Sequence, residues 1–169
     1  TRLIIADSEK NANLYYATRF LAPDPFVFVQ VDPADGGAGA RTVMVMSDLE
    51  VDRARSQAKV TEVLSYTKLA AQAKRRLNAE PAFLDVVDET LKHVGATAIE
   101  VPTDFSVHYA DLLRTRGYTL KAKPEPFYPQ RLIKSKEEVA QITQTLRATE
   151  EALESAIELI RNSEIKPDG

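Results

Sequence analysis

The chain has 169 residues, of which 44% are hydrophobic, and its 22 basic and 25 acidic side chains give a net charge of −3. This length suffices for one large domain or for one domain with an extension. The negative charge argues against a nucleic-acid partner, and no apolar run approaches the roughly 20 residues of a membrane span. The sequence has no cysteine, which excludes disulfides and thiolate chemistry and predicts a cytoplasmic location.

The first part of the sequence predicts three strands. Short runs of β-branched, aromatic and aliphatic residues at 2–6, 26–31 and 42–46 are typical of strands. The intervening residues 32–39 contain Pro, Asp and three Gly, which is turn chemistry. We therefore expect a hairpin here rather than a phosphate-binding loop, because no Lys-Ser/Thr pair and no helix follow the glycines.

Helices and strands alternate in the sequence after residue 46. The predicted helices cover 49–58, 67–77, 81–95 and 103–117, with Asp48, Thr67 and Thr103 as N-caps and Gly95 and Gly117 as C-terminal stops; the predicted strands cover 60–65, 97–101 and 118–123. This alternation predicts an α/β domain with a mixed sheet and flanking helices, because the leading hairpin adds antiparallel pairing.

A proline-rich connector and a long amphipathic helix follow. Three prolines within 124–129 predict a stiff, extended segment. Ser135 and Glu138 form a capping-box pattern. The apolar residues after it recur at helical spacing: Val139, Ile142, Leu146, Leu153, Ile157 and Ile160. Residues 165–169 (Ile-Lys-Pro-Asp-Gly) would stop this helix. Its apolar face needs a partner, so we expect the chain to be the front part of a longer protein.

Three short motifs carry a family resemblance. Residues 131–139 (Arg-Leu-Ile-Lys-Ser-Lys-Glu-Glu-Val) resemble the segment that leads into the pita-bread domain of the creatinase/prolidase/aminopeptidase P family. Residues 165–169 resemble the Ile-Lys-Pro-Gly that closes the first helix of that domain. Residues 13–20 (Asn-Leu-Tyr-Tyr-Ala-Thr-Arg-Phe) resemble the family's Asn-x-x-Tyr-Leu-Thr-Gly-Phe motif, with Arg19 where Gly is usual.

The resemblance implies an N-terminal domain that is somewhat like ribonuclease H, over residues 1–123. Residues 124–134 would be a connector, and 135–169 the first helix of a truncated catalytic domain. The family's catalytic domain holds two divalent metals (Mn, Co or Zn) through Asp, Asp, His, Glu and Glu ligands and hydrolyses Xaa-Pro peptides. Those ligands would come after residue 169, so this fragment is expected to lack catalytic and metal-binding residues and to be inactive alone. A homodimer is also implied.

The candidate site residues are Tyr16, Arg19 and Asp24. They belong to a segment (15–26) that combines aromatic residues, an arginine and prolines, and we expect it to be a loop before a strand. In the family, the corresponding loop reaches toward the substrate cleft of the partner subunit. Arg19 could there bind the carboxylate of a proline-containing peptide through its two-pronged donor geometry.

Other polar groups have simpler interpretations. Asp85, Asp88 and Glu89 are predicted to lie on the solvated face of a helix, and His93 near the C-terminus of that helix. Two alternatives to the peptidase interpretation remain open. One is a stand-alone α/β ligand-binding or regulatory module that dimerises through its last helix. The other is a ribonuclease-H-like nuclease with acids drawn from Asp7, Asp24 and Asp48. Within the family, a creatinase-type hydrolase or a pseudoenzyme is also possible.

Overall fold

The computed structural model describes residues 1–33 and 39–164. The chain divides into two compact units, Thr1–Tyr128 and Pro129–Gly169. The first unit holds the sheet and five helices within the described residues, and the second holds one long helix.

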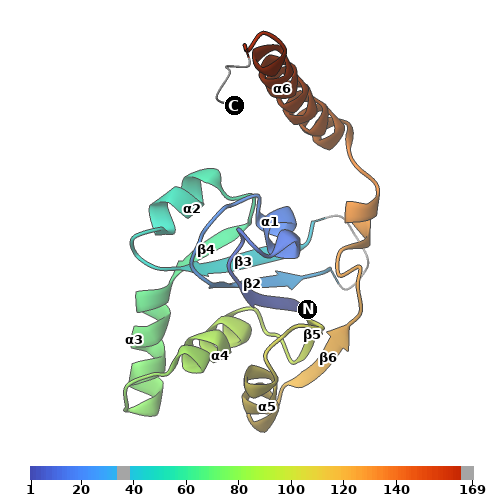
Figure 1. Cartoon of the computed structure of the whole chain (residues 1–169). Helices are drawn as coiled ribbons and strands as arrows, with labels where there is room; N and C mark the ends of the chain where they lie inside the picture. The colour runs from blue at the N-terminus through green and yellow to red at the C-terminus, as the bar shows by residue number, and fades with distance from the viewer. Residues whose placement is uncertain (34–38, 165–169) are drawn as a thin grey trace. The chain divides into compact units, whose positions relative to one another are not determined.

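Within the described residues, one six-stranded sheet forms the centre of the first unit, in the order β4-β3-β2-β1-β5-β6 (Figure 1). The strands are β1 (Arg2–Ala6), β2 (Phe26–Val31), β3 (Arg41–Met46), β4 (Glu62–Ser65), β5 (Ala98–Pro102) and β6 (Thr119–Lys123). The pairs β1/β2 and β2/β3 are antiparallel, and the other three pairs are parallel. The predicted mixed sheet is confirmed, and β2 and β3 pair as expected. The predicted turn between them includes residues 34–38, which lie outside the described residues.

Helices pack against both faces of the sheet. The first face packs against α3 (Tyr66–Leu77), α4 (Phe83–His93) and α5 (Val107–Thr115), and the second against α1 (Ala12–Thr18) and α2 (Val51–Gln57). Figure 1 shows these two groups on opposite sides of the strands. Alternate residues of β1 to β4 therefore enter different cores: Val27 and Val45 contact the first group, whereas Phe28 and Met44 contact the second.

The helix starts differ from those predicted. Asp48, Thr67 and Thr103 are not N-caps; the N-cap positions are Glu50, Ser65 and Ser106. Ser65 shows why. Its hydroxyl accepts a hydrogen bond from the backbone N–H of Lys68 (3.2 Å) and donates one to the carboxylate of Asp48. The acid that was expected to cap α2 is therefore engaged by the residue that caps α3.

The first unit extends past β6 to Tyr128. Phe127 is fully buried and Tyr128 is 4% exposed, and both pack on the face that carries α1 and α2. The side chain of Asn13 donates a hydrogen bond to Glu125 (3.0 Å), and the hydroxyl of Tyr128 donates one to Gln30 (3.1 Å). Phe127 and Tyr128 are thus part of the α/β core, although the sequence indicates a connector from residue 124.

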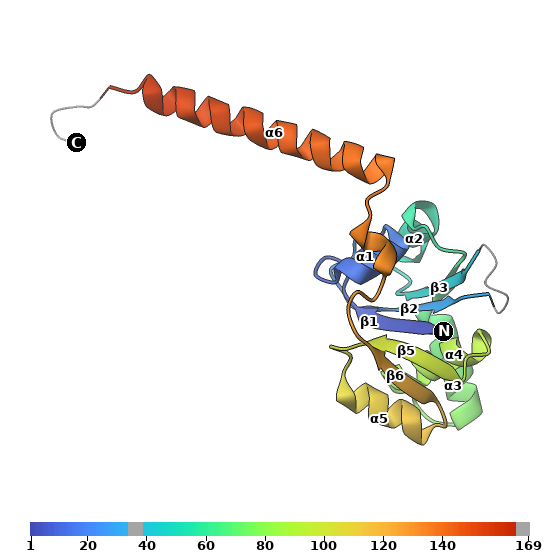
Figure 2. The same ribbon diagram turned by 90° about the vertical axis from the view of Figure 1, so that its right-hand side faces the viewer.

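The second unit begins with a 3₁₀ turn (Pro129–Leu132), and α6 (Lys136–Arg161) follows. The predicted capping box is confirmed. The backbone N–H of Glu138 donates to the Ser135 hydroxyl (3.2 Å), and the backbone N–H of Ser135 donates to the Glu138 carboxylate (3.0 Å). Figure 2 shows α6 as one uninterrupted helix. The predicted stop at residues 165–169 lies outside the described residues.

Candidate functional site

The segment predicted to be a loop from residue 15 is in fact helical in its first part. Helix α1 runs from Ala12 to Thr18, and the side chain of Asn11 caps it by accepting a hydrogen bond from the backbone N–H of Leu14 (2.9 Å). The Asn11 cap satisfies a backbone donor that the first turn would otherwise leave free.

Arg19 ends α1 in the left-handed conformation, with φ 51° and ψ 28°. Its backbone N–H donates to the carbonyl of Tyr15 (2.7 Å), which closes the helix. Left-handed residues at this position are usually glycine, because a Cβ atom is unfavourable there. Arg19, which stands where the family motif has Gly, thus occupies a position where the backbone favours Gly.

Two arginines and two tyrosines are stacked beside this helix end. The guanidinium carbon of Arg19 lies 4.8 Å from the centre of the Tyr16 ring. The Tyr16 ring lies 5.9 Å from that of Tyr128, and the guanidinium carbon of Arg2 lies 5.3 Å from the Tyr128 ring. Burial raises the pKa of the Tyr128 hydroxyl, so this ring stays neutral. The stack fixes Tyr16 and orients the Arg19 side chain.

The loop after Arg19 is held at Ala22. The backbone N–H of Ala22 donates to the hydroxyl of Ser8 (2.8 Å), and the backbone N–H of Ser8 donates to the carbonyl of Ala22 (3.2 Å). Phe20 is buried and meets Phe26 edge to face, with 6.4 Å between the ring centres. These contacts leave the next residues, including Asp24, on the surface of a fixed loop.

Arg53 of α2 supports the same loop from the other side. Its guanidinium carbon lies 4.1 Å from the centre of the Phe20 ring, and its Nη2 donates to the carbonyl of Leu21 (2.9 Å). Its Nε donates to the carboxylate of Glu50 (2.7 Å). Arg53 therefore links the loop to the start of α2 and holds Glu50 in place.

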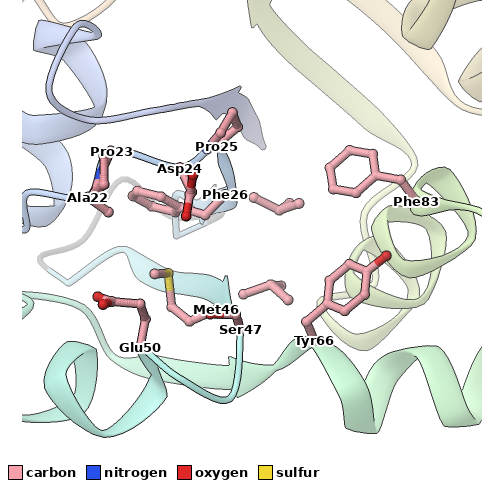
Figure 3. A pocket seen from close by; sticks show the side chains of 12 residues that line it. Ala22, Pro23, Asp24, Pro25, Phe26, Met46, Ser47, Glu50, Tyr66 and Phe83 are labelled. Carbon is pink, nitrogen blue, oxygen red and sulfur yellow. The ribbon is translucent and has the colours of Figure 1, made fainter.

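A pocket of about 260 Å³ opens beside this loop. It is lined by Ala22, Pro23, Asp24, Pro25, Phe26, Val27, Val45, Met46, Ser47, Glu50, Tyr66 and Phe83. Figure 3 shows Asp24 and Glu50 on one side of the hollow and the rings of Tyr66 and Phe83 on the other. The pocket thus combines an apolar interior with carboxylates at one side.

The structure separates the three sequence-predicted site residues. Asp24 lines the pocket, whereas Tyr16 and Arg19 contact each other and are not among its lining residues. Sequence reasoning missed Glu50 and Tyr66, which line the same pocket. A usable signal was present, since each of them follows a predicted strand by a few residues, and such positions often line sites in α/β folds.

The acids of α4 are buried rather than solvated, which corrects the prediction for Asp85 and Asp88. Asp85 accepts a hydrogen bond from the backbone N–H of Ala82 (2.7 Å) and forms an ion pair with Arg116 (2.9 Å). Arg116 also donates to the carbonyl of Leu84 (2.7 Å). The acid is therefore both a helix-capping group and an ion-pair partner of the residue that ends α5.

Asp88 lies at the centre of a second group of contacts, and its side chain is 6% exposed. Its carboxylate accepts bonds from Tyr118 (2.7 Å), Lys92 (2.7 Å) and Arg76 (2.9 Å), and Arg76 also pairs with Glu89. Burial raises the pKa of Asp88, but the hydrogen bonds from Lys92 and Tyr118 outweigh it, so the pKa is lowered overall. This network joins α3, α4 and the residue that precedes β6, and it is structural.

His93 was predicted to lie near the C-terminus of a helix, and it is the last residue of α4. It belongs to a surface ion-pair group. Its Nε2 lies 2.8 Å from the carboxylate of Glu62, which also pairs with Arg41 (2.9 Å). The hydrogen bond from Arg41, helped by His93, lowers the pKa of Glu62. These contacts tie α4 to β3 and β4 at the sheet edge, so they account for His93 without a ligand.

The nuclease alternative lacks the required geometry. Asp7 accepts a hydrogen bond from the backbone N–H of Lys10 (2.9 Å), and Asp48 accepts one from Ser65, so each is used locally. Over residues 1–33 and 39–164, no group of three or more His, Cys, Asp or Glu side chains could hold a metal ion. The acids Asp7, Asp24 and Asp48 therefore do not form a metal site. In the same residues, no helix has both the length and the apolar character that crossing a bilayer requires.

Comparison with known proteins gives matches in structure only. No family model and no curated protein sequence matches this chain. X-Pro aminopeptidase from Thermotoga maritima MSB8 is similar with a TM-score of 0.68 and 12% identity, over 94% of this chain and 40% of that one. Prolidase from Pyrococcus horikoshii OT3 gives 0.60 and 18%, and prolidase from Pyrococcus furiosus gives 0.57 and 16%, each over 93% of this chain and 38% of the other.

The chain spans about two fifths of the length of these peptidases. At identities below 20% such a likeness shows the fold. The resemblance that the motifs at residues 13–20 and 131–139 indicate is thus confirmed in three dimensions: the chain has the fold of one part of the prolidases and X-Pro aminopeptidases.

Proposed function

We propose that this chain is the non-catalytic N-terminal part of an Xaa-Pro peptidase of the dipeptidase or aminopeptidase P type. The observation that carries the proposal is the coverage, since nearly the whole chain matches peptidases of which it represents only 38–40%. Motifs near both ends of the sequence point to the same family. The parent enzyme would hydrolyse the peptide bond that precedes proline.

The proposed division of the chain places an N-terminal domain at 1–123, a connector at 124–134 whose residues Phe127 and Tyr128 pack into that domain, and the first helix of the catalytic domain at 135–169. The large exposed apolar side chains of α6 support the last assignment; they are Val139, Ile142, Leu146, Leu153, Ile157, Leu159 and Ile160. Full burial of each is worth about 1.5–3 kcal/mol. The remainder of the catalytic domain is the proposed cover for this face.

The two divalent metals of such peptidases do not fit the residues of this chain. Within the described residues, no cluster of three or more ligating side chains exists. In the proposed parent, the metals and the hydroxide that attacks the peptide bond would therefore be held by residues outside this chain. The contribution of this chain would be to dimer contacts and to the wall of the substrate cleft.

Tyr16, Arg19 and Asp24 are the residues proposed to face the substrate cleft of a partner subunit. Arg19 is suited to bind a peptide carboxylate, because Tyr16 orients its guanidinium. Asp24 lies on an adjacent part of the same loop and is exposed. Replacement of Arg19 by Ala in the full-length enzyme tests this role, and unchanged KM and kcat would refute it.

The decisive test of the proposed function is the reading frame that continues after residue 169. We expect at least about 350 residues in total, with the five metal ligands downstream. The full-length protein with Mn²⁺ or Co²⁺ should hydrolyse an Xaa-Pro dipeptide, whereas the 169-residue chain under the same conditions should not. Robust hydrolysis by the 169-residue chain, or a full-length protein without the ligands, would overturn the proposal.

The alternative of a stand-alone ligand-binding or regulatory module has one observation in its favour, the pocket beside Asp24. The same experiment separates the two proposals, because a stand-alone module would have no catalytic domain downstream. A cytoplasmic location is part of the proposal and rests on the cysteine-free sequence.

A further inference from the structure

The pocket beside Asp24 occupies a topological switch point of the sheet. The chain leaves β3 to form α2 on one face, and it leaves β4 to form α3 on the opposite face. Ser47 follows β3 directly and Tyr66 follows β4 directly, and both line the pocket. Neighbouring strands whose following helices diverge leave a crevice at their carboxyl ends, and ligands of open α/β sheets bind in such crevices.

The interior of this pocket is apolar. Val27 and Val45 come from the paired strands β2 and β3, and the rings of Tyr66 and Phe83 stack with 6.5 Å between their centres. Figure 3 shows these rings on the side opposite Asp24. A space of about 260 Å³ with such walls accommodates a group of the size of one aromatic or branched aliphatic side chain.

The charged groups of the pocket are all acidic. Asp24 and Glu50 are the only ionisable side chains besides the Tyr66 phenol in the lining, which lies wholly within the described residues. Glu50 is held by Arg53, whereas Asp24 forms no hydrogen bond or ion pair within the described residues. An anionic ligand would be repelled here, and a cation would gain a carboxylate partner.

We propose that this pocket binds a primary ammonium ion that carries one apolar group, with the ammonium at Asp24 and the apolar group between Val45 and Tyr66. The proposal does not depend on the peptidase assignment, because every residue in it belongs to the first unit. Phosphorylated ligands do not fit, since the lining supplies no Lys, Arg or His side chain.

Titration of the 169-residue chain with three matched compounds, followed by NMR, tests the proposal. The compounds are 2-phenylethylamine, the neutral 2-phenylethanol and the anionic 3-phenylpropionate. We expect a millimolar dissociation constant for the amine, because a ligand of about nine heavy atoms makes few contacts. Chemical-shift changes should appear at the methyl groups of Val27, Val45 and Met46. The alcohol should bind several-fold more weakly, and the anion should not bind.

Two variants separate this site from general attraction to an acidic protein. Asp24→Asn should weaken binding of the amine by up to about five-fold, the upper end for one exposed charge pair, and should leave binding of the alcohol unaffected. Asp52→Asn removes the same charge from an exposed α2 residue that does not line the pocket. It should change the affinity for neither the amine nor the alcohol. Ser47→Phe places a ring at the pocket edge and should weaken binding of both the amine and the alcohol.

Equal binding of the amine and the alcohol, equal effects of the Asp24 and Asp52 variants, or shifts confined to other residues would each overturn the proposal. Absence of any shift at 10 mM amine would do so as well. None of these outcomes bears on the proposed peptidase function, which is decided by the downstream sequence and by hydrolysis assays.

Discussion

The guanidinium of Arg19 packs over the ring of Tyr16 while its own backbone adopts a left-handed conformation. The two features oppose each other in energy. A left-handed non-glycine residue costs about 1–2 kcal/mol, and a cation–π contact at a partly exposed site returns about 0.5–1 kcal/mol. The stacking thus offsets part of the backbone cost.

We predict that Arg19→Ala lowers the free energy of unfolding by about 0.5–1 kcal/mol, because the stacking is lost and the strain stays. Arg19→Gly should be about 1 kcal/mol more stable than Arg19→Ala, because glycine removes the strain. Urea denaturation measures both. Asn78→Gly is the matched control: Asn78 also has a positive φ of 52° at a helix end, but Asn tolerates it, so a smaller gain is expected. Equal stability of the two Arg19 variants would contradict the argument.

Replacement of Asp88 by Asn should lower the free energy of unfolding by about 2–3 kcal/mol, because a buried carboxylate loses its charge between Arg76 and Lys92. Asp111→Asn is the control, since that acid is exposed and pairs with Arg114 at the surface. It should cost about 0.5 kcal/mol or less. Equal losses in the two variants would show that the Asp88 network contributes no more than a surface ion pair.

The same network predicts a pH dependence. The pKa of Asp88 is lowered in the folded state, relative to about 3.9 in the unfolded chain. The stabilisation is therefore complete above about pH 5 and is lost as the pH falls through the unfolded and then the folded pKa. Denaturation curves between pH 7 and pH 3 should converge for the wild type and Asp88→Asn. A constant difference over this range would refute the lowered pKa.

Phe127 should contribute as much to the free energy of unfolding as buried residues within the sheet. Phe127→Ala is expected to lower the free energy of unfolding by about 3–5 kcal/mol, because a fully buried ring is replaced by a cavity. Leu132→Ala, which changes an exposed side chain of the second unit, should cost less than 0.5 kcal/mol. Thermal denaturation followed by near-UV circular dichroism compares them. A cost below 1 kcal/mol for Phe127 would place residues 125–128 outside the core.

The apolar face of α6 should drive association of the 169-residue chain. We expect light scattering to show dimers or larger species, and we expect Leu146→Glu with Leu153→Glu to yield a monomer whose first unit melts unchanged, since both residues are exposed. Gln144→Glu with Ser155→Glu adds the same charge at polar positions and should not dissociate the chain. A monomeric wild type with a fully helical α6 would contradict the burial argument.

The strands and α6 could be predicted because their signals are local. Residues 26–31 and 41–46 are rich in β-branched side chains, and the Ser135–Glu138 capping box is formed by residues three positions apart. Helix α1 was missed because it is only seven residues long and its start depends on a single cap, Asn11, before a sequence that includes Asn13, Tyr15, Tyr16 and Thr18, which have modest helix propensity.

The burial of Asp85 and Asp88 could not be predicted, because their partners Arg76, Arg116 and Tyr118 come from other elements. A carboxylate on a helix is expected to face solvent unless the fold brings cationic side chains from other elements next to it. The pocket could not be predicted for the same reason, because its lining is assembled from segments that are distant in the sequence, near residues 22–27, 45–50, 66 and 83. Asp24 was singled out from the sequence, whereas Glu50 and Tyr66 were not, although each of them follows a predicted strand by a few residues.

The stack of Arg2, Tyr128, Tyr16 and Arg19 connects the second residue of the chain to the last residue of the first unit. Fraying at either end of that unit would therefore release the other. Amide protons of β1 and of residues 127–128 should then exchange with solvent in one cooperative event, at the free energy of global unfolding, rather than through independent local openings.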